Sequence, residues 1–447
     1  MASSAEQLAQ NLNFGAFSKA TELKKRLWFT LGALIIYRLG TFIPIPGIDP
    51  VIMQDIFQQN TGGILGMFDM FAGGALGRMT IFALNILPYI SASIIMQLMT
   101  SVSPKFAQLK KEGEQGRKKI NQYTRYGTVL LAAVQGYGIA VGLESMTSSQ
   151  GSAVIDPGTF FRLTTVITLT SGTVFLMWLG EQVTARGVGN GISLIIFAGI
   201  VANLPSAMAA TLELGRTGAL SAGFIIFLII AMLGLITFVV FIERAQRRIV
   251  VQYPKRQSGN RMFGGESSHI PLKLNTSGVI PVIFASSLLL LPITIANFGA
   301  GSGPDWLVGM SALLGRGQPL YLLLYASGII FFAFFYTAIV FNPGDTADNL
   351  KQNGGFVPGI RPGKNTADYL DHVLTRLTVV GSIYLVGVAV LPEILISRFG
   401  VPFYFGGTSL LIVVTVSMDT VAQIQSHLLA HQYEGLIKKS KLRGRKR

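Results

Sequence analysis

Apolar runs of about 20 residues recur along the whole chain, and each is long enough for a helix to cross the ~30 Å hydrocarbon core of a bilayer. Within lipid, helices and closed barrels are the structures that satisfy every backbone polar group internally. Half of the 447 residues are hydrophobic and 13% are charged, whereas about 25% are charged in a typical soluble domain. The sequence therefore predicts an all-α integral membrane protein. We expect ten membrane-spanning helices, near residues 25–43, 79–100, 124–143, 161–180, 189–207, 219–242, 276–296, 319–341, 375–392 and 402–425.

Basic residues are distributed unevenly between the two ends of these predicted helices. Thirty of the 36 lysines and arginines lie in the two tails or in alternate loops. Loops rich in lysine and arginine stay on the cytoplasmic side when a membrane protein inserts. We therefore expect both termini in the cytoplasm, which agrees with an even number of helices.

An even division of ten helices gives two halves of five. Because five is odd, the halves would insert in opposite senses, so the count favours an inverted repeat about an axis in the membrane plane. This division predicts a cytoplasmic tail, a first half, a hinge connection, a second half and a basic tail, at residues 1–24, 25–207, 208–218, 219–425 and 426–447.

Two basic loops in the second half, residues 243–275 and 342–374, are longer than topology requires. Loops above about 15 residues without their own secondary structure are usually functional or disordered. Extended basic surfaces of this kind can hold the phosphates of a nucleic acid or an acidic protein partner. We expect these loops to bind a partner.

The interiors of the predicted helices contain almost no ionisable residues. Arg38 is near the outer end of the first helix, and Glu181 and Asp419 are near cytoplasmic ends. Transporters of small solutes usually carry such residues at membrane depth. The pattern argues against a secondary transporter of small solutes, but from these residues alone both such a transporter and a polypeptide channel stay open.

Catalysis and metal binding are not expected. The chain contains no cysteine, which excludes disulfides and thiolate ligands. His427 and His431 are four residues apart, but the glutamate of the HExxH zinc pattern is missing between them. We therefore expect no enzyme, no cofactor and no metal site.

Small and polar residues interrupt two of the predicted helices. The stretch NILPYISAS, residues 85–93, places a proline inside the helix predicted at 79–100, and GVGNGISLIIFAG opens the helix predicted at 189–207. Glycine, proline and hydroxyl groups at membrane depth permit close helix approach. Each motif by itself favours ordinary helix packing.

Ten motifs give the chain a resemblance to a known family. In chain order they are IPIPGID, MFAGGAL, PYISASIIMQL, KKEGEQGRKKINQYTRYGT, LMWLGEQ, GVGNGISLIIFAGI, ERAQRRIVVQY, FNPGDTADNLK, GFVPGIRPG and VPFYFGGTSLLIVV. Together they resemble the SecY family, the central channel subunits of the bacterial protein translocase, and they extend over nearly the whole chain. The resemblance implies a clamshell of two five-helix halves around an hourglass pore in the bacterial plasma membrane. It implies the transport of unfolded secretory polypeptides and the lateral release of hydrophobic segments into lipid.

The resemblance also implies a ring of aliphatic side chains at the narrowest point of the pore. Within each of two pairs the isoleucines are four residues apart, and so share a helix face. Stiff, branched side chains offer water and ions no hydrogen-bond partner, so such a ring would seal by dewetting. For any isoleucine alone, lipid contact or helix packing is the alternative. Carried over by motif, the ring consists of Ile86, Ile90, Ile192, Ile196, Ile283 and Ile412.

The segment at residues 61–75 is apolar, too short to span a bilayer and flanked by glycine pairs. The resemblance implies that it is a plug, a short helix folded into the outer funnel, with the glycines as hinges. The alternative is an amphipathic helix on the outer leaflet. The side chains expected to fill the funnel are Ile64, Leu65, Met67, Phe68, Met70 and Phe71.

Signal sequences and nascent polypeptides would intercalate between the helix of Ile86 and the helix of Ile283, as the resemblance implies. Ser91 and Gln135 are the candidates for polar contacts that keep this lateral gate closed.

The family's partners are implied in the same way. The motor ATPase SecA and the ribosome would dock on the basic loops, with Arg361, Arg256 and Arg261 as contact residues. The further partners are the membrane subunits SecE and SecG, the proteins SecD, SecF and YidC, and the membrane lipids.

Overall fold

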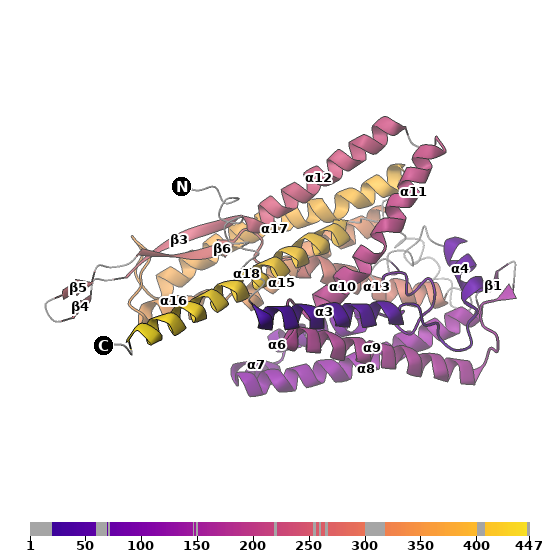
Figure 1. Cartoon of the computed structure of the whole chain (residues 1–447), viewed down its shortest axis with the longest axis horizontal. Helices are drawn as coiled ribbons and strands as arrows, with labels where there is room; N and C mark the ends of the chain where they lie inside the picture. Colours follow the sequence, from indigo (N-terminus) through magenta and orange to yellow (C-terminus); the bar gives the residue numbers. More distant parts are fainter. Residues whose placement is uncertain are drawn as a thin grey trace.

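Long helices from both halves of the chain run side by side, and a smaller part containing β-strands projects from one end (Figure 1). The computed structural model describes residues 20–59, 69, 72–145, 147–148, 151–218, 221–253, 256–258, 261–263, 267–299, 318–399 and 407–444.

The first half of the chain forms a helical layer that ends in a helical connection. Its elements are α3 (Thr21–Gly40), α4 (Pro50–Gln59), α6 (Leu87–Val102), α7 (Pro104–Lys111), α8 (Glu114–Ser145), β1 (Thr147–Ser148), β2 (Gly151–Ser152), α9 (Thr159–Arg186), α10 (Gly191–Ala202) and α11 (Leu204–Arg216). The predicted hinge connection at 208–218 is therefore largely helical, because most of it lies within α11.

The second half combines long helices with two antiparallel strand pairs. Its elements are α12 (Ala222–Arg244), β3 (Gln246–Gln252), β4 (Arg256–Ser258), β5 (Arg261–Phe263), β6 (Ser267–Lys273), α13 (Ile280–Gly299), α15 (Pro319–Val340), α16 (Pro343–Gln352), α17 (Lys364–Phe399) and α18 (Gly407–Gly444). Strand β3 pairs with β6 from Gln246 opposite Lys273 to Gln252 opposite Ser267.

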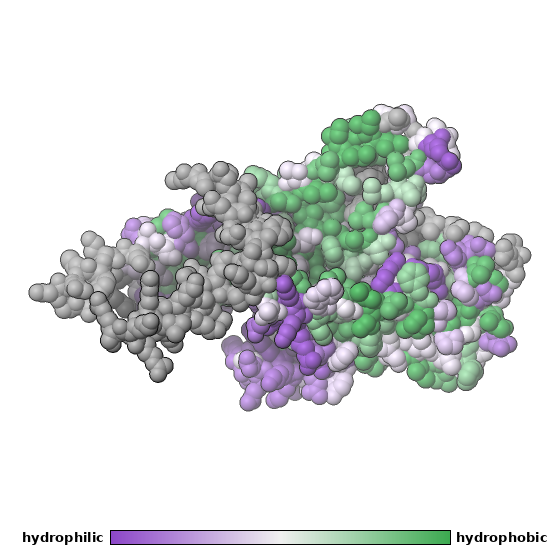
Figure 2. All heavy atoms as spheres, viewed as in Figure 1, coloured by the Kyte–Doolittle hydropathy of each residue, from purple (hydrophilic) through white to green (hydrophobic). Residues whose placement is uncertain are grey.

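The long helices expose apolar side chains on their outer faces. Ile230, Leu323 and Ile383 are each more than 60% exposed, and hydrophobic surface covers much of the sides of the helices in Figure 2. By length and composition, seven helical segments of the described part could cross a membrane, and α6 and the described part of α13 are shorter apolar helices. Each of the ten predicted spans overlaps a described helix. The all-α membrane architecture is confirmed, and the number ten stays a prediction.

The predicted helix at 79–100 is wrong over its first eight residues. Residues 79–86 form turns, and Met79 and Asn85 have φ values of 44° and 48°. Backbone hydrogen bonds join this stretch to the segment that follows α3, from Ile45 N to Met79 O (3.0 Å) and from Ile81 N to Ile43 O (3.0 Å). Pro88 therefore lies in the first turn of α6 rather than in mid-helix, where its missing N–H costs no hydrogen bond.

The two long basic loops form one folded unit instead of two separate loops. The Gln252 and Phe356 backbones exchange hydrogen bonds of 2.9 and 3.0 Å, which attaches the second loop to the β3–β6 pair. A hydrophobic core drawn from both loops includes Ile249, Leu272 and Val357 together with Leu370 of α17. We call this unit, the described residues of 246–273 together with 341–377, the two-loop module.

The two halves of the chain share a single buried core. Residues from α3, α6, α9 and α10 pack with residues from α12, α13, α15, α17 and α18. Helix α13 contacts α6 and α8 of the first half, and α10 contacts α18 of the second. The Gly189 N–H, just before α10, donates to Gln423 Oε1 of α18 at 2.8 Å.

Close helix contacts in this core depend on glycine. A Cβ atom at Gly172 of α9 would lie 2.0 Å from the carbonyl oxygen of Ile81, whereas nothing lies within 4 Å of a Cβ at Gly138 of α8. The turn at residues 79–86 can therefore approach α9 because position 172 has no side chain.

Substituting Gly172 with alanine should destabilise the protein, because the new methyl group meets backbone rather than a flexible side chain. We expect Gly172→Ala to lower the free energy of unfolding by about 1–3 kcal/mol. Gly138→Ala is the matched control, and should be neutral or gain up to about 1 kcal/mol in helix propensity. Thermal unfolding in detergent measures both, and equal midpoints for the two variants would contradict the packing analysis.

Candidate functional site

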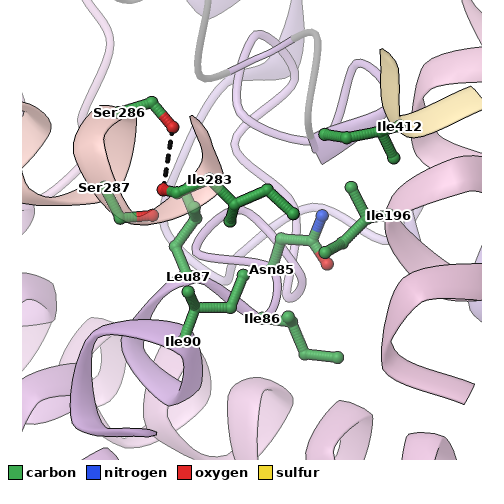
Figure 3. Close-up of a pocket in the computed structure, with 9 residues that line it drawn as sticks. All are labelled: Asn85, Ile86, Leu87, Ile90, Ile196, Ile283, Ser286, Ser287 and Ile412. Carbon is green, nitrogen blue, oxygen red and sulfur yellow. Dashed lines mark hydrogen bonds between the residues drawn. The ribbon is translucent and has the colours of Figure 1, made fainter. Parts of the chain in front are cut away.

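Four helices from both halves bring isoleucine side chains to one place near their first turns. Ile86 precedes α6 directly and Ile90 lies in its first turn, while Ile196 and Ile412 are the sixth residues of α10 and α18. Ile283 lies in the first turn of α13, where its N–H donates to Val279 O at 3.2 Å. These side chains point towards a common space (Figure 3).

That space is a narrow cavity with room for about one water molecule. Ile86 and Ile412 are each 1% exposed, and Ile90 and Ile196 are also buried. The lining is largely aliphatic and includes three polar residues. The lining residues are Asn85, Ile86, Leu87, Ile90, Ile196, Ile283, Ser286, Ser287 and Ile412.

Five of the six isoleucines predicted for the ring line this cavity, and Ile192 is not among its lining residues. The backbone of Ile192 is held at the start of α10, where its N–H donates to Asn190 Oδ1 at 3.1 Å. Its side chain packs against α9, since a Cβ built on Gly180 would lie 3.1 Å from Ile192 Cγ1. The i, i+4 spacing correctly pairs positions 192 and 196 on one side of the helix, but the cavity does not extend a full turn towards Asn190.

Three further lining residues were not predicted from the sequence. Leu87, Ser286 and Ser287 are neighbours in sequence or on the helix of predicted ring residues, and helical spacing from Ile283 indicates Ser286. The Ser286 hydroxyl donates to Ile283 O at 2.9 Å (Figure 3). The Ser287 Oγ is buried without a hydrogen-bond partner in the described part of the chain. Asn85 reaches the cavity because its positive φ turns the backbone just before α6.

The predicted lateral-gate residues lie on the two first-half helices that contact α13. Ser91 is buried in α6, and Gln135 is half-buried in α8. The helix of Ile283 therefore packs against both helices that carry these candidates. Their role in closing a gate stays a prediction.

The six predicted plug side chains, from Ile64 to Phe71, lie outside the described residues. The chain just after them is described and is held firmly. Gly73 and Gly74 have φ values of 67° and 83°, as expected of a glycine turn. Asp69 Oδ1 accepts from the Gly77 N–H at 2.7 Å. Burial raises the pKa of Asp69, and the hydrogen bond from Gly77 opposes the shift.

Two arginines hold the same glycine turn. Arg38 Nη1 donates to Gly73 O at 2.7 Å, and Arg78 Nε donates to Gly74 O at 3.0 Å. Both guanidinium groups lie over the ring of Phe42, at 4.9 and 4.1 Å from its centroid. The end of the predicted plug segment is thus attached to the end of α3 by cation–π and hydrogen-bonding contacts.

All three predicted partner-contact arginines belong to the two-loop module. Arg361 is exposed before α17, and its carbonyl accepts from the Thr366 hydroxyl at 2.9 Å. Arg256 lies on β4 and Arg261 on β5, within one antiparallel pair. The side chains of Arg256 and Arg261 lie outside the described part of the structure. The module therefore presents residues from both basic loops on one folded unit.

Comparisons with known proteins agree with the motifs and with this geometry. A family model described as SecY matches residues 80–421. The protein translocase subunit SecY of Escherichia coli strain K12 is 59% identical over 426 residues, which cover 95% of this chain and 96% of the relative. The protein of the same name from Rickettsia conorii is 56% identical over 429 residues, which cover 96% of this chain and 99% of the relative.

Solved structures of similar fold are more distant in sequence. The structure of a protein-conducting channel matches with a TM-score of 0.68 at 18% identity, over 91% of this chain and 92% of that one. Sec61 in the canine ribosome-channel complex from the endoplasmic reticulum matches with a TM-score of 0.64 at 18% identity, again over 91% and 92%. These likenesses bear on the fold. Because the family model covers most of the chain and close relatives cover nearly all of it, the chain belongs to the SecY family.

Proposed function

We propose that this chain is the channel subunit of a bacterial translocase, through which unfolded secretory polypeptides cross the plasma membrane. The observation that carries the proposal is the convergence of Ile86, Ile90, Ile196, Ile283 and Ile412 on one cavity. These side chains come from four helices in both halves of the chain. Membership of the SecY family removes the small-solute transporter as an alternative.

The chemistry of the cavity suits a seal that yields to a polymer. Branched aliphatic side chains offer neither water nor ions a hydrogen-bond partner, so a narrow opening between them dewets. The seal makes no specific bond to the passing chain, so any unfolded sequence can push the side chains aside. Because both halves contribute, a small separation of the halves widens the opening.

Release into the membrane would follow from the contacts of α13 with α6 and α8. Parting these helices would expose a segment in the pore to lipid. Apolar segments would then partition sideways, while each charged side chain at the bilayer centre opposes this by ~2.5–3.5 kcal/mol. Signal sequences would enter the lipid by the same route.

The energy for moving a polypeptide through the channel would come from partner proteins. The translocase relatives are named as subunits, which supports SecE and SecG as companions in the membrane, with SecD, SecF and YidC as further ones. The Sec61 neighbour is part of a ribosome-channel complex. We propose that the two-loop module faces the cytoplasm, as its lysines and arginines require, and that SecA and the ribosome dock there.

Crosslinking of a stalled secretory chain tests the channel directly. A photoreactive residue at position 86 or 283, both of which line the cavity, should crosslink the stalled chain strongly. Position 230 is the control, because the Ile230 side chain is exposed on the outer face of α12, and it should crosslink several-fold less. Equal crosslinking at all three positions would count against a path through the cavity.

Deleting residues 64–71 distinguishes a plug from an interfacial helix. If the segment fills the outer funnel, its removal takes away a second barrier, and the ion conductance of the resting channel in planar bilayers should rise. If it lies on the outer leaflet, the conductance should stay at the level of the unaltered channel.

Reversing the charge at Arg361 should abolish export driven by the motor. Arg361→Glu places a carboxylate on the surface where an acidic partner would bind, and like charges in an interface cost several kcal/mol. Lys351→Glu is the matched control, because Lys351 is also exposed in the two-loop module, and it should retain export. The amount of protein in the membrane must be equal for both variants, and retained export with Arg361→Glu would remove this residue from the docking site.

A further inference from the structure

A buried hydrogen bond connects the end of α12 to the short linker between the two-loop module and α13. Asn275 Nδ2 donates to Glu243 Oε1 at 2.7 Å, and the same Nδ2 donates to Gly278 O at 3.0 Å. Glu243 is 8% exposed and Asn275 is 3% exposed. A buried carboxyl group is costly unless it is paired, so this bond fixes the linker in one position.

The linker around this bond is held from three sides. The Leu274 N–H donates to Ala245 O at 2.9 Å, which continues the β3–β6 pairing up to the end of α12. The Ser277 hydroxyl donates to Asn275 Oδ1 at 3.0 Å. Helix α17 lies close below, since a Cβ at Gly381 would come within 3.0 Å of Leu274 O. The carboxyl group of Glu243 also lies near Tyr384 of α17 and Asp419 of α18.

This position matters because the linker leads directly into the cavity. Helix α13 begins at Ile280, and Ile283, Ser286 and Ser287 in its first turns line the space between the isoleucines. The same helix contacts α6 and α8 of the first half. Any displacement of residue 275 therefore moves a helix that forms one wall of the cavity and one side of the predicted lateral gate.

We propose that Asn275 and Glu243 are positioning residues that hold α13 in the closed state and transmit movements of the two-loop module to it. The inference rests on the proposed function of the chain as a protein channel. In the closed state the hydrogen bond keeps α13 against α6 and α8. Loss of the bond lowers the free-energy cost of shifting α13, so that a weaker signal sequence suffices to open the gate.

Discrimination against a defective signal sequence is the property that should change. A hydrogen bond to a charged group contributes about 1.5–3 kcal/mol, so its loss should raise export of a precursor with a defective signal about tenfold or more. Affinity for the motor should stay unchanged, because neither residue is exposed on the module. A purely structural role would instead lower export of all precursors together.

The experiment uses the complete translocase in proteoliposomes, with the motor, ATP and two precursors that differ in their signal sequence. Asn275→Asp removes the donor and faces Glu243 with a second carboxyl group. Glu243→Ala removes the acceptor without adding charge, and it replaces Asn275→Asp in the test if that variant fails to accumulate in the membrane. Both variants should raise export of the precursor with the defective signal sequence about tenfold or more.

Two further variants make the result specific. The double variant Glu243→Gln with Asn275→Asp exchanges donor and acceptor, so a hydrogen bond can form again, and its selectivity should return to within about twofold of the unaltered protein. Thr276→Ala is the matched control from the same linker. Its hydroxyl donates to Lys273 O rather than to Glu243, so the selectivity of this variant should be unchanged.

The outcomes separate the two levels of the proposal. The positioning role is wrong if Asn275→Asp and Glu243→Ala discriminate against the defective signal sequence as strongly as Thr276→Ala does. It is also wrong if the double variant is as unselective as the single variants. In either case the proposed channel function is unaffected. If the unaltered complex fails to export even the intact precursor, the proposed function is overturned, and this inference with it.

Discussion

Every backbone polar group at membrane depth has to find a partner within the protein, and this requirement shapes the whole chain. The long helices meet it through their own hydrogen bonds. Residues 73–86 are not helical, and they and Ala72 find their partners in other ways. Their backbone groups pair with residues 43–45, with the guanidinium groups of Arg38 and Arg78, and with the hydroxyl of Tyr37. The cavity lies where this irregular stretch ends and α6 begins, because the turn at residues 79–86 positions Ile86 and Ile90.

The sequence was sufficient for the class of fold and for most of the candidate site. Long apolar runs predict helices because the bilayer imposes a minimum length. Five of the six ring isoleucines meet around one cavity, since positions four apart keep one face and the motifs fix which face it is. Ile192 is not among the lining residues, and its place in the ring stays a prediction. The start of α10 is set by the Asn190 cap, a local contact, and by the close approach to Gly180, a tertiary contact that the spacing does not reveal.

Other features could not be predicted because they depend on contacts between distant segments. The apolar stretch from 79 to 86 has the composition of a helix, and tertiary hydrogen bonds override it. The two basic loops lie about a hundred residues apart in sequence, and each by itself has the composition of a flexible connection. Their common core of Ile249, Leu272, Val357 and Leu370 emerges when the β3–β6 pair packs on α17. Asn275 and Glu243 are single polar residues in sequence, and their significance comes from burial.

The common core of the two-loop module has a mechanical consequence. Both loops come from the second half of the chain, so the module is attached to the half that carries α13 and α18. A partner that binds the module can push or rotate this half of the chain. It can widen the opening when it also binds the other half. Helix α7 and the start of α8 lie towards the same end of the molecule as the module (Figure 1), and they carry Lys110, Lys111 and Lys118. Two separate basic binding surfaces, one on each half of the chain, would let a single large partner move the two halves of the channel relative to one another.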